Sequence, residues 1–160
     1  MSEQPYQALT YTSMISVGYL LRRDQALLSE IVEPVLESHE FTMVQYQILV
    51  WLRDGMVCNP RDISSQYRHD SGALTRVIDQ LSERGYLMRV RRNRDRRKIE
   101  LELTAAGLAK VESLIPLVVE RLNLALKDFS SAEVQEFLRL LLKFNATLQS
   151  IVEPVPSLDT

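Results

Sequence analysis

The spacing of apolar residues along the chain predicts a series of helices and one β-hairpin. Between residues 9 and 36 no strong helix breaker stands before Pro34, and apolar side chains recur at helical spacing, which predicts a long first helix. Thr42, with Gln45 three residues later, forms a capping-box pattern, and the apolar stripe that follows ends at Gly55. We therefore expect a second helix between Thr42 and Gly55.

Two shorter helices are predicted next. The Asn-Pro-Arg-Asp run at residues 59–62 supplies a cap, a first-turn proline and a first-turn acid, which is typical of a helix start. A fourth helix is expected to begin at Asp70 or Ser71 and to stop at Gly85. Its apolar positions follow helical spacing on one face only and are Leu74, Val77, Ile78 and Leu81.

Beyond Gly85 the apolar period changes from helical to alternating, which indicates a β-hairpin. The alternating apolar residues of the two expected strands are Tyr86, Met88, Val90, Ile99, Leu101 and Leu103. Between them stands the run RRNRDRRK, residues 91–98, so the hairpin has a basic tip.

Two long helices are predicted to complete the chain. Thr104 caps a fifth helix through residue 126, which Pro116 is expected to kink. Ser130, with Glu133 in capping-box position, starts a sixth helix that runs to about residue 152. The predicted fold is mainly α with a small β-hairpin wing, a winged helix-turn-helix flanked by dimerisation helices.

This order of elements predicts four segments. Residues 1–40 form an N-terminal dimerisation helix, residues 41–104 a winged helix-turn-helix lobe, residues 105–152 C-terminal dimerisation helices, and residues 153–160 a flexible tail. In the C-terminal helices an almost wholly apolar stretch, residues 137–144, leaves little polar surface and must be covered on several sides. A second copy of the chain is the expected cover, with additional monomer core as the alternative.

Composition and charge narrow the class of protein. The 160 residues are 46% hydrophobic and 25% charged, as in an average globular protein, and no apolar run approaches the roughly 20 residues of a membrane span. The N-terminus lacks the pattern of a secretion signal, and a single cysteine fits a reducing compartment, so we expect a cytoplasmic protein. The net charge of -2 hides a basic middle: residues 61–98 carry 11 basic and 5 acidic side chains, between two acidic ends. Such segregation is expected where one part of a fold faces phosphate.

The fourth helix is the candidate recognition helix. Away from its apolar stripe it carries short or hydrogen-bonding side chains, which allow close approach to a groove and contact with phosphates or base edges. The predicted DNA contacts on this helix are Ser71, Gly72, Ala73, Thr75, Arg76 and Gln80.

The basic tip of the hairpin is the second candidate DNA contact. Arginines clustered on a tight turn repel one another unless an anion gathers them, although a solvated hairpin of mixed charge remains the alternative. The predicted contacts are Arg91, Arg92, Arg94, Asp95, Arg96, Arg97 and Lys98. Asp95 is the one acid among them, and we expect it to orient a neighbouring arginine through an ion pair.

The stretch from Asp70 to Gly107 resembles the multiple antibiotic resistance regulator (MarR) family. The resemblance rests on the helix DSGALTRVIDQLSERG, the Asp-x-Arg of the wing and the Leu-Thr-x-x-Gly at residues 103–107. It implies that Arg97 enters the minor groove with Asp95 as its support, and that dimerisation uses the first and last two helices. It also implies a pocket for a small aromatic or anionic effector between the dimer helices and the DNA-binding lobe.

Four residues of the predicted first helix are candidates for that pocket, namely Tyr11, Tyr19, Arg22 and Arg23. They offer aromatic and cationic lining, although a tyrosine stripe at helical spacing is more often packing.

Other chemistry has little support in the sequence. Cys58 follows apolar Met56 and Val57, so we expect a buried thiol that acts as a small hydrophobe rather than a redox sensor. His39 and His69 lie 30 residues apart without a cysteine cluster or paired carboxylates at ligand spacing, so neither a metal site nor a cofactor is expected, and surface or capping roles are the default for both. No nucleophile motif or phosphate loop is present, and we expect no catalytic residue and no enzyme.

The sequence therefore predicts a homodimeric, sequence-specific regulator of transcription that binds double-stranded DNA. We expect a ligand-responsive repressor on a pseudo-palindromic operator, although activator action is equally compatible with the residues. The alternative is a winged-helix module for protein-protein assembly that has no operator.

Overall fold

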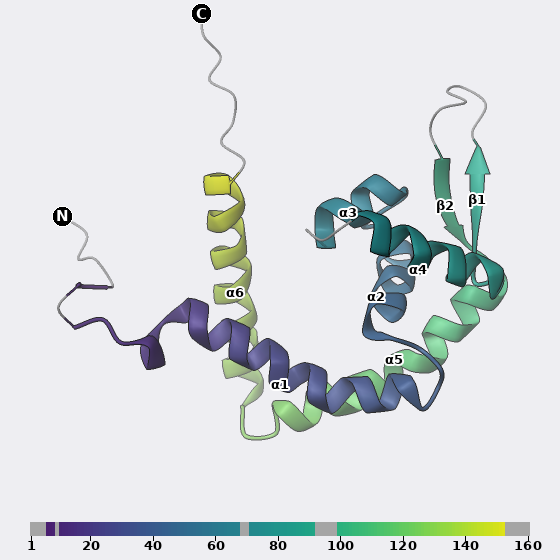
Figure 1. The fold of residues 1–160 in the computed structure, drawn as a ribbon. Helices are drawn as coiled ribbons and strands as arrows, with labels where there is room; N and C mark the ends of the chain where they lie inside the picture. Colours follow the sequence, from purple (N-terminus) through teal and green to yellow (C-terminus); the bar gives the residue numbers. More distant parts are fainter. Residues whose placement is uncertain (1–5, 9, 68–70, 92–98, 153–160) are drawn as a thin grey trace, which may run out of the picture. The chain divides into compact units, whose positions relative to one another are not determined.

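The computed structural model describes residues 6–8, 10–67, 71–91 and 99–152. Its elements in chain order are a 3-10 turn at Ser13–Ile15, α1 at Val17–Glu37, α2 at Met43–Arg53, α3 at Pro60–Tyr67, α4 at Ser71–Glu83, β1 at Leu87–Arg91, β2 at Ile99–Leu103, α5 at Ala105–Ala125 and α6 at Ser131–Val152 (Figure 1). The predicted class, mainly α with one antiparallel hairpin, is confirmed. The chain divides into two compact units after Leu122, and each unit is described by itself.

The first helix begins later than predicted. Ser16 adopts an extended conformation before Val17, and the N–H of Val17 donates to the hydroxyl of Tyr6 at 2.9 Å. The placement of Tyr11 on this helix is therefore wrong. In this stretch the Thr10 hydroxyl donates to the carbonyl of Gln7 at 3.4 Å, a local contact of the kind that hydroxyl side chains make outside helices.

The capping boxes that begin α2 and α6 are confirmed. The N–H of Gln45 donates to Thr42 Oγ1 at 3.2 Å, and the N–H of Thr42 donates to Gln45 Oε1 at 3.1 Å. Ser130 and Glu133 make the same reciprocal pair at 3.3 and 2.8 Å. The Ser130 hydroxyl also donates to the Glu133 carboxylate at 2.7 Å, and this bond, followed by that from the Ser130 N–H, lowers the pKa of the Glu133 carboxyl. The side chains thus satisfy N–H groups that each helix start would leave without a partner.

The phase predicted for the first strand is wrong. Leu87 is buried and Met88 is 45% exposed, so the core-facing residues are one position out of step with the Tyr86, Met88, Val90 series. The cause lies at the end of α4, where Gly85 has a φ of 73° and the N–H of Tyr86 donates to the carbonyl of Leu81. Tyr86 therefore belongs to the helix cap, and the strand begins after it.

The hairpin pairs Leu87 with Leu103 and Arg89 with Leu101, so one face is apolar at its base and basic toward its tip. The opposite face carries Met88 and Glu102 as direct partners. The predicted alternation in β2 is confirmed by Leu101, which is 3% exposed.

The entry to α5 explains the Leu-Thr-x-x-Gly pattern. Thr104 Oγ1 donates to the carbonyl of Gly85 at 2.6 Å and accepts the N–H of Gly107 at 3.0 Å, which ties the hairpin and α5 to the end of α4. A Cβ at Gly107 would lie 1.8 Å from the carbonyl oxygen of Tyr86, so only glycine fits there.

The core of the first unit joins every element from α1 to α5. Its buried residues are Val32, Leu36, Phe41, Ile48, Leu49, Val57, Ile63, Leu74, Ile78, Leu81, Leu87, Leu101, Val111, Leu114 and Val118. The N-terminal half of α1 stays outside this core, since Leu20, Leu21, Leu27 and Leu28 are exposed.

The second unit consists of the end of α5, a turn and α6. Phe129 in the turn packs against Phe137 with ring centroids 6.2 Å apart, and Arg139 pairs with Glu136 at 2.7 Å. No residue of α6 is buried, and Leu138 and Leu142 are 53% and 69% exposed. Of the helices in the described part of the chain, none has the length and apolar character that a membrane span requires.

Candidate nucleic-acid interface

The candidate interface begins with α4, whose two faces differ sharply. Leu74, Ile78 and Leu81 are at most 4% exposed and anchor the helix in the core. The predicted contacts Gly72, Ala73, Thr75, Arg76 and Gln80 are all exposed. Ser71 is the first residue of the helix, and its side chain lies outside the described residues. The helix therefore presents short and polar side chains on a surface that the core holds in place.

Arg76 is the cation of this face. Within the described ranges no hydrogen bond or ion pair engages its side chain, so the guanidinium is available to an outside partner. Gly72, Arg76 and Gln80 follow one another at four-residue spacing and therefore share one stripe of the helix. A guanidinium is suited to guanine edges and to phosphate oxygens.

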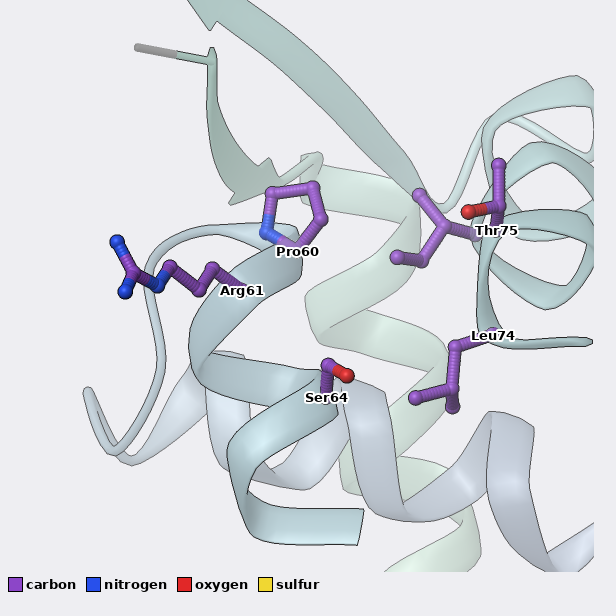
Figure 2. A pocket seen from close by; sticks show the side chains of 6 residues that line it. Pro60, Arg61, Ser64, Leu74 and Thr75 are labelled. Carbon is purple, nitrogen blue, oxygen red and sulfur yellow. The ribbon is translucent and has the colours of Figure 1, made fainter. Parts of the chain in front are cut away.

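A hollow of about 280 Å³ separates α4 from α3, which lies beside it (Figures 1 and 2). Its lining residues are Pro60, Arg61, Ser64, Leu74, Thr75 and Ile78. Figure 2 shows that Arg61 extends away from Leu74 and Thr75, so its charge is displaced from the α4 side of the hollow. The hollow thus has residues of α3 on one side and, on the other, Thr75 together with the buried side chains of Leu74 and Ile78 on α4.

Two side-chain contacts link the outer face of α4 to neighbouring elements. Arg89 on β1 donates to the carboxylate of Asp79, which neutralises this acid of α4. Gln80 Oε1 accepts a hydrogen bond of 3.1 Å from Nε2 of Gln45, a residue of α2 that is 7% exposed. The wing base and the start of α2 therefore both help to place the helix.

Arg84, at the end of the helix region, has a structural role. Its guanidinium donates to the carbonyl of Glu40 at 2.8 Å and lies 4.5 Å from the ring centroid of Phe41. It also lies 5.1 Å from the ring centroid of Tyr86, so it contacts both aromatic rings. This cation is engaged within the fold.

The basic tip of the hairpin is described only at its base. Arg91 ends β1 opposite Ile99, and its side chain is exposed. The other predicted wing residues, Arg92, Arg94, Asp95, Arg96, Arg97 and Lys98, lie outside the described residues. Their DNA contacts stay a prediction.

The expected burial of Cys58 is wrong, because the thiol is exposed. Asp62 at the start of α3 accepts hydrogen bonds from the Cys58 N–H at 3.1 Å and from its thiol at 3.3 Å. The hydrogen bond to Asp62 raises the pKa of the Cys58 thiol, whereas the Cys58 N–H lowers the pKa of the Asp62 carboxyl. The chain turns outward at Cys58 to place this N–H at the helix start, an effect that apolar neighbours alone do not reveal. A raised pKa disfavours the thiolate that redox sensing requires.

His39 lies at the end of α1, where Nδ1 makes a 2.9 Å contact with the carbonyl of Val35, in keeping with a surface or capping role. His69 lies outside the described residues. In the parts of the chain that are described, no group of three or more His, Cys, Asp or Glu residues is arranged to hold a metal ion.

The four candidate pocket residues do not form one stripe. Tyr11 precedes the helix, is 52% exposed and packs edge-on against Tyr6 with ring centroids 5.7 Å apart. Tyr19, Arg22 and Arg23 lie on α1, where Tyr19 is half-buried and both arginines are exposed. The effector pocket therefore stays a prediction.

Sequence reasoning missed two residues that position the recognition surface. Gln45 was expected only to cap its own helix, and its contact with Gln80 spans 35 residues of sequence. Arg89 was given no role from the sequence, yet it pairs with Asp79. Local periodicity carries no signal for such contacts, because they depend on how separate elements pack.

A helix pair whose second helix exposes a polar face, followed by a two-stranded hairpin, defines a winged helix-turn-helix protein. The MarR family model matches residues 41–99, which include α2, α3, α4 and β1. The chain is similar to the MarR family over these residues.

Curated relatives match most of the chain. The multiple antibiotic resistance protein MarR of Escherichia coli K12 is 28% identical over 137 residues, which cover 83% of this chain and 92% of the relative. The transcriptional repressor NicR of Pseudomonas putida is 25% identical, with 89% of this chain and 90% of the relative covered.

Solved structures of MarR-family proteins have a fold similar to that of this chain. The structure of Escherichia coli MarR without ligand has a TM-score of 0.71 and 26% identity, and covers 81% of this chain and 97% of that chain. The structure of Bordetella bronchiseptica BpsR, described as regulated in its DNA binding by 6-hydroxynicotinic acid, has a TM-score of 0.73 and 28% identity, with coverages of 84% and 96%. A MarR variant from Escherichia coli has been solved with operator DNA, with a TM-score of 0.71 and 25% identity.

Proposed function

We propose that this chain is a sequence-specific regulator of transcription that binds double-stranded DNA through α4. The observation that carries the proposal is the exposed polar face of α4, on which Arg76 has no partner among the described residues while Leu74, Ile78 and Leu81 fix the helix in the core. In a winged helix-turn-helix, the second helix enters the major groove and the hairpin lies along the neighbouring backbone or minor groove. The exposed cation Arg91 at the end of β1 fits that arrangement.

The protein acts as a homodimer in this proposal. On α6, apolar side chains recur at three- and four-residue spacing and stay accessible, namely Phe137, Leu141, Phe144, Leu148 and Ile151. The N-terminal half of α1 exposes four leucines as well. A second copy that covers such stripes removes apolar surface from water and pairs two recognition helices, which requires a pseudo-palindromic operator.

The regulatory mode is repression that a small molecule relieves. The relative NicR is named a transcriptional repressor, and the DNA binding of BpsR is described as regulated by 6-hydroxynicotinic acid, an aromatic acid. By analogy the effector is a small aromatic anion, for which Tyr19, Arg22 and Arg23 offer aromatic and cationic groups. The role is regulatory rather than catalytic, and it places the protein in the cytoplasm, with the DNA.

Selection of binding sites from random duplex DNA tests this proposal. The purified protein is expected to enrich a pseudo-palindromic sequence and to bind random duplexes more weakly, with affinity that falls as salt rises. A protein that enriches no sequence and shows no salt-dependent binding to duplex DNA would instead be an assembly module.

A further inference from the structure

The capping box of α2 fixes how the amide of Gln45 is oriented. A backbone N–H can only donate, so the atom of Gln45 that lies 3.1 Å from the N–H of Thr42 must be Oε1. The Nε2 group of Gln45 is consequently at the other corner of the amide. Because Gln45 is 7% exposed, its side chain has little freedom to turn.

The orientation of the Gln45 amide in turn fixes the orientation of the Gln80 amide on α4. Nε2 of Gln45 lies 3.1 Å from the side-chain amide of Gln80, and as a donor it must meet Oε1 of Gln80. The carbonyl end of the Gln80 amide is therefore engaged, and its NH2 group is the end left for another partner. The Gln80 side chain is exposed and lies one turn beyond Arg76 on the same stripe of α4.

We propose that Gln45 is a positioning residue that makes Gln80 a hydrogen-bond donor toward DNA. This inference rests on the proposed function and deepens it. A glutamine that reads adenine in the bidentate manner must accept from N6 and donate to N7, which requires both ends of the amide. With its oxygen engaged by Gln45, Gln80 instead presents its NH2 group to acceptors on DNA. A base contact then favours guanine, with its O6 and N7 acceptors, or O4 of thymine over adenine, whose N7 acceptor lies beside the N6 donor; phosphate oxygens are the other partners for this NH2 group.

The substitution Gln45→Glu tests the orientation directly. Glutamate is a usual residue at this capping-box position, so the carboxylate still accepts the N–H of Thr42 and α2 keeps its start. The carboxylate cannot donate, however, so Gln80 must turn its NH2 group toward it and expose its carbonyl oxygen. On the operator selected by the wild-type protein, Gln80→Ala first identifies the base pair, if any, whose preference depends on Gln80.

If Gln80 contacts a base, Gln45→Glu should reverse that preference from guanine or thymine to adenine or cytosine, by roughly three- to tenfold in relative affinity. If Gln80 contacts phosphate, Gln45→Glu should weaken binding to all sequences alike. In that case the loss should shrink when Gln80 is already alanine, because the double-mutant cycle isolates the part that acts through Gln80.

Two further variants serve as controls. Thr42→Ala damages the same cap but leaves the Thr42 N–H and the Gln45 amide in place, so the base preference should not change. Gln45→Leu removes both ends of the amide and should leave Gln80 free to turn, which broadens the preference. This second variant also provides the test if Gln45→Glu fails to fold.

Binding preferences and affinities of folded Gln45→Glu that match wild type, or effects of Gln45→Glu and Gln80→Ala that simply add, would overturn the inference while the proposed function stands. A wild-type protein that selects no operator would overturn both.

Discussion

The winged lobe and α6 differ in where their apolar side chains lie: within the core of the chain in the lobe, and at the surface on α6. On α4 the apolar residues are buried within the same chain, as Ile78 at 1% exposure shows, and the polar face is left outside. On α6 no residue is buried, and Leu148 and Ile151 are 44% and 68% exposed. The lobe is therefore complete as a folded body, whereas α6 is stable only if another surface covers it. The comparison predicts that substitutions in the lobe reduce folding stability, whereas substitutions on α6 reduce dimerisation.

The largest effect is expected from a charge in the core of the lobe. Ile78→Asp places an unpaired carboxylate beside Leu74 and Leu81 and should cost several kcal/mol, enough to unfold a domain of ordinary stability. Far-ultraviolet circular dichroism during a urea titration measures the loss. A variant with the wild-type unfolding midpoint would show that α4 is not anchored as described.

The next effect is dissociation of the dimer while the winged lobe stays folded. Leu148→Glu on α6 should shift the protein from dimer to monomer in sedimentation velocity at micromolar concentration, because the charge is desolvated only when a second copy covers it. Ser150→Glu, an exposed polar position on the same helix, is the matched control and should leave the dimer intact. If the wild-type protein itself sediments as an 18.4 kDa monomer, the interpretation of α6 is wrong.

A smaller effect is expected on the polar face of α4. Arg76→Ala should reduce affinity for the selected operator by about 1–3 kcal/mol if the guanidinium reads a base, while the unfolding midpoint and dimerisation stay unchanged. Fluorescence anisotropy with operator and random duplexes separates the cases. An equal loss on both duplexes assigns Arg76 to phosphate, and no loss on either removes it from the interface.

The smallest effect concerns the start of α3. The Asp62 carboxylate accepts the Cys58 N–H, which lowers its pKa below the ordinary value of 3.8. The ionised carboxylate therefore makes its full contribution to the free energy of unfolding above pH 3.8. This contribution is lost as pH falls through the lower pKa of Asp62 in the folded state. Asp62→Ala should cost about 1 kcal/mol of unfolding free energy near neutral pH, since solvent screens the site.

The difference between wild type and Asp62→Ala should narrow as urea titrations are carried below pH 3.8. A difference that is independent of pH would mean that the hydrogen bonds to the carboxylate contribute nothing to stability.

Sequence patterns were sufficient to predict the features that depend only on residues close together in the chain. The capping boxes of α2 and α6, the glycine stop at Gly85 and the apolar stripe of α4 all depend on residues within one or two turns, and each was predicted correctly. The exposed face of α4 followed from the same pattern, because burial of one side of a helix determines the other.

Errors arose where a neighbouring element decided the outcome. Tyr86 alternates with Met88 in sequence, but its N–H donates to the carbonyl of Leu81 and so belongs to the cap of α4. The buried position of the strand is therefore Leu87, one residue away from the predicted series. Cys58 has apolar neighbours, yet the need for a cap on α3 turns it outward. Gln45 and Arg89 act on α4 across packed elements, which a period of 2 or 3.6 residues cannot encode.

The central claim is that two identical lobes, joined by surfaces that the single chain leaves uncovered, read DNA through α4. Dimethyl sulfate protection of guanine N7 on the selected operator, combined with the stoichiometry of the complex, tests it most directly. The claim predicts two chains per operator and two symmetric sets of major-groove protections centred about 10–10.5 base pairs apart. One chain per site, or protections confined to a single half-site at saturation, would contradict it.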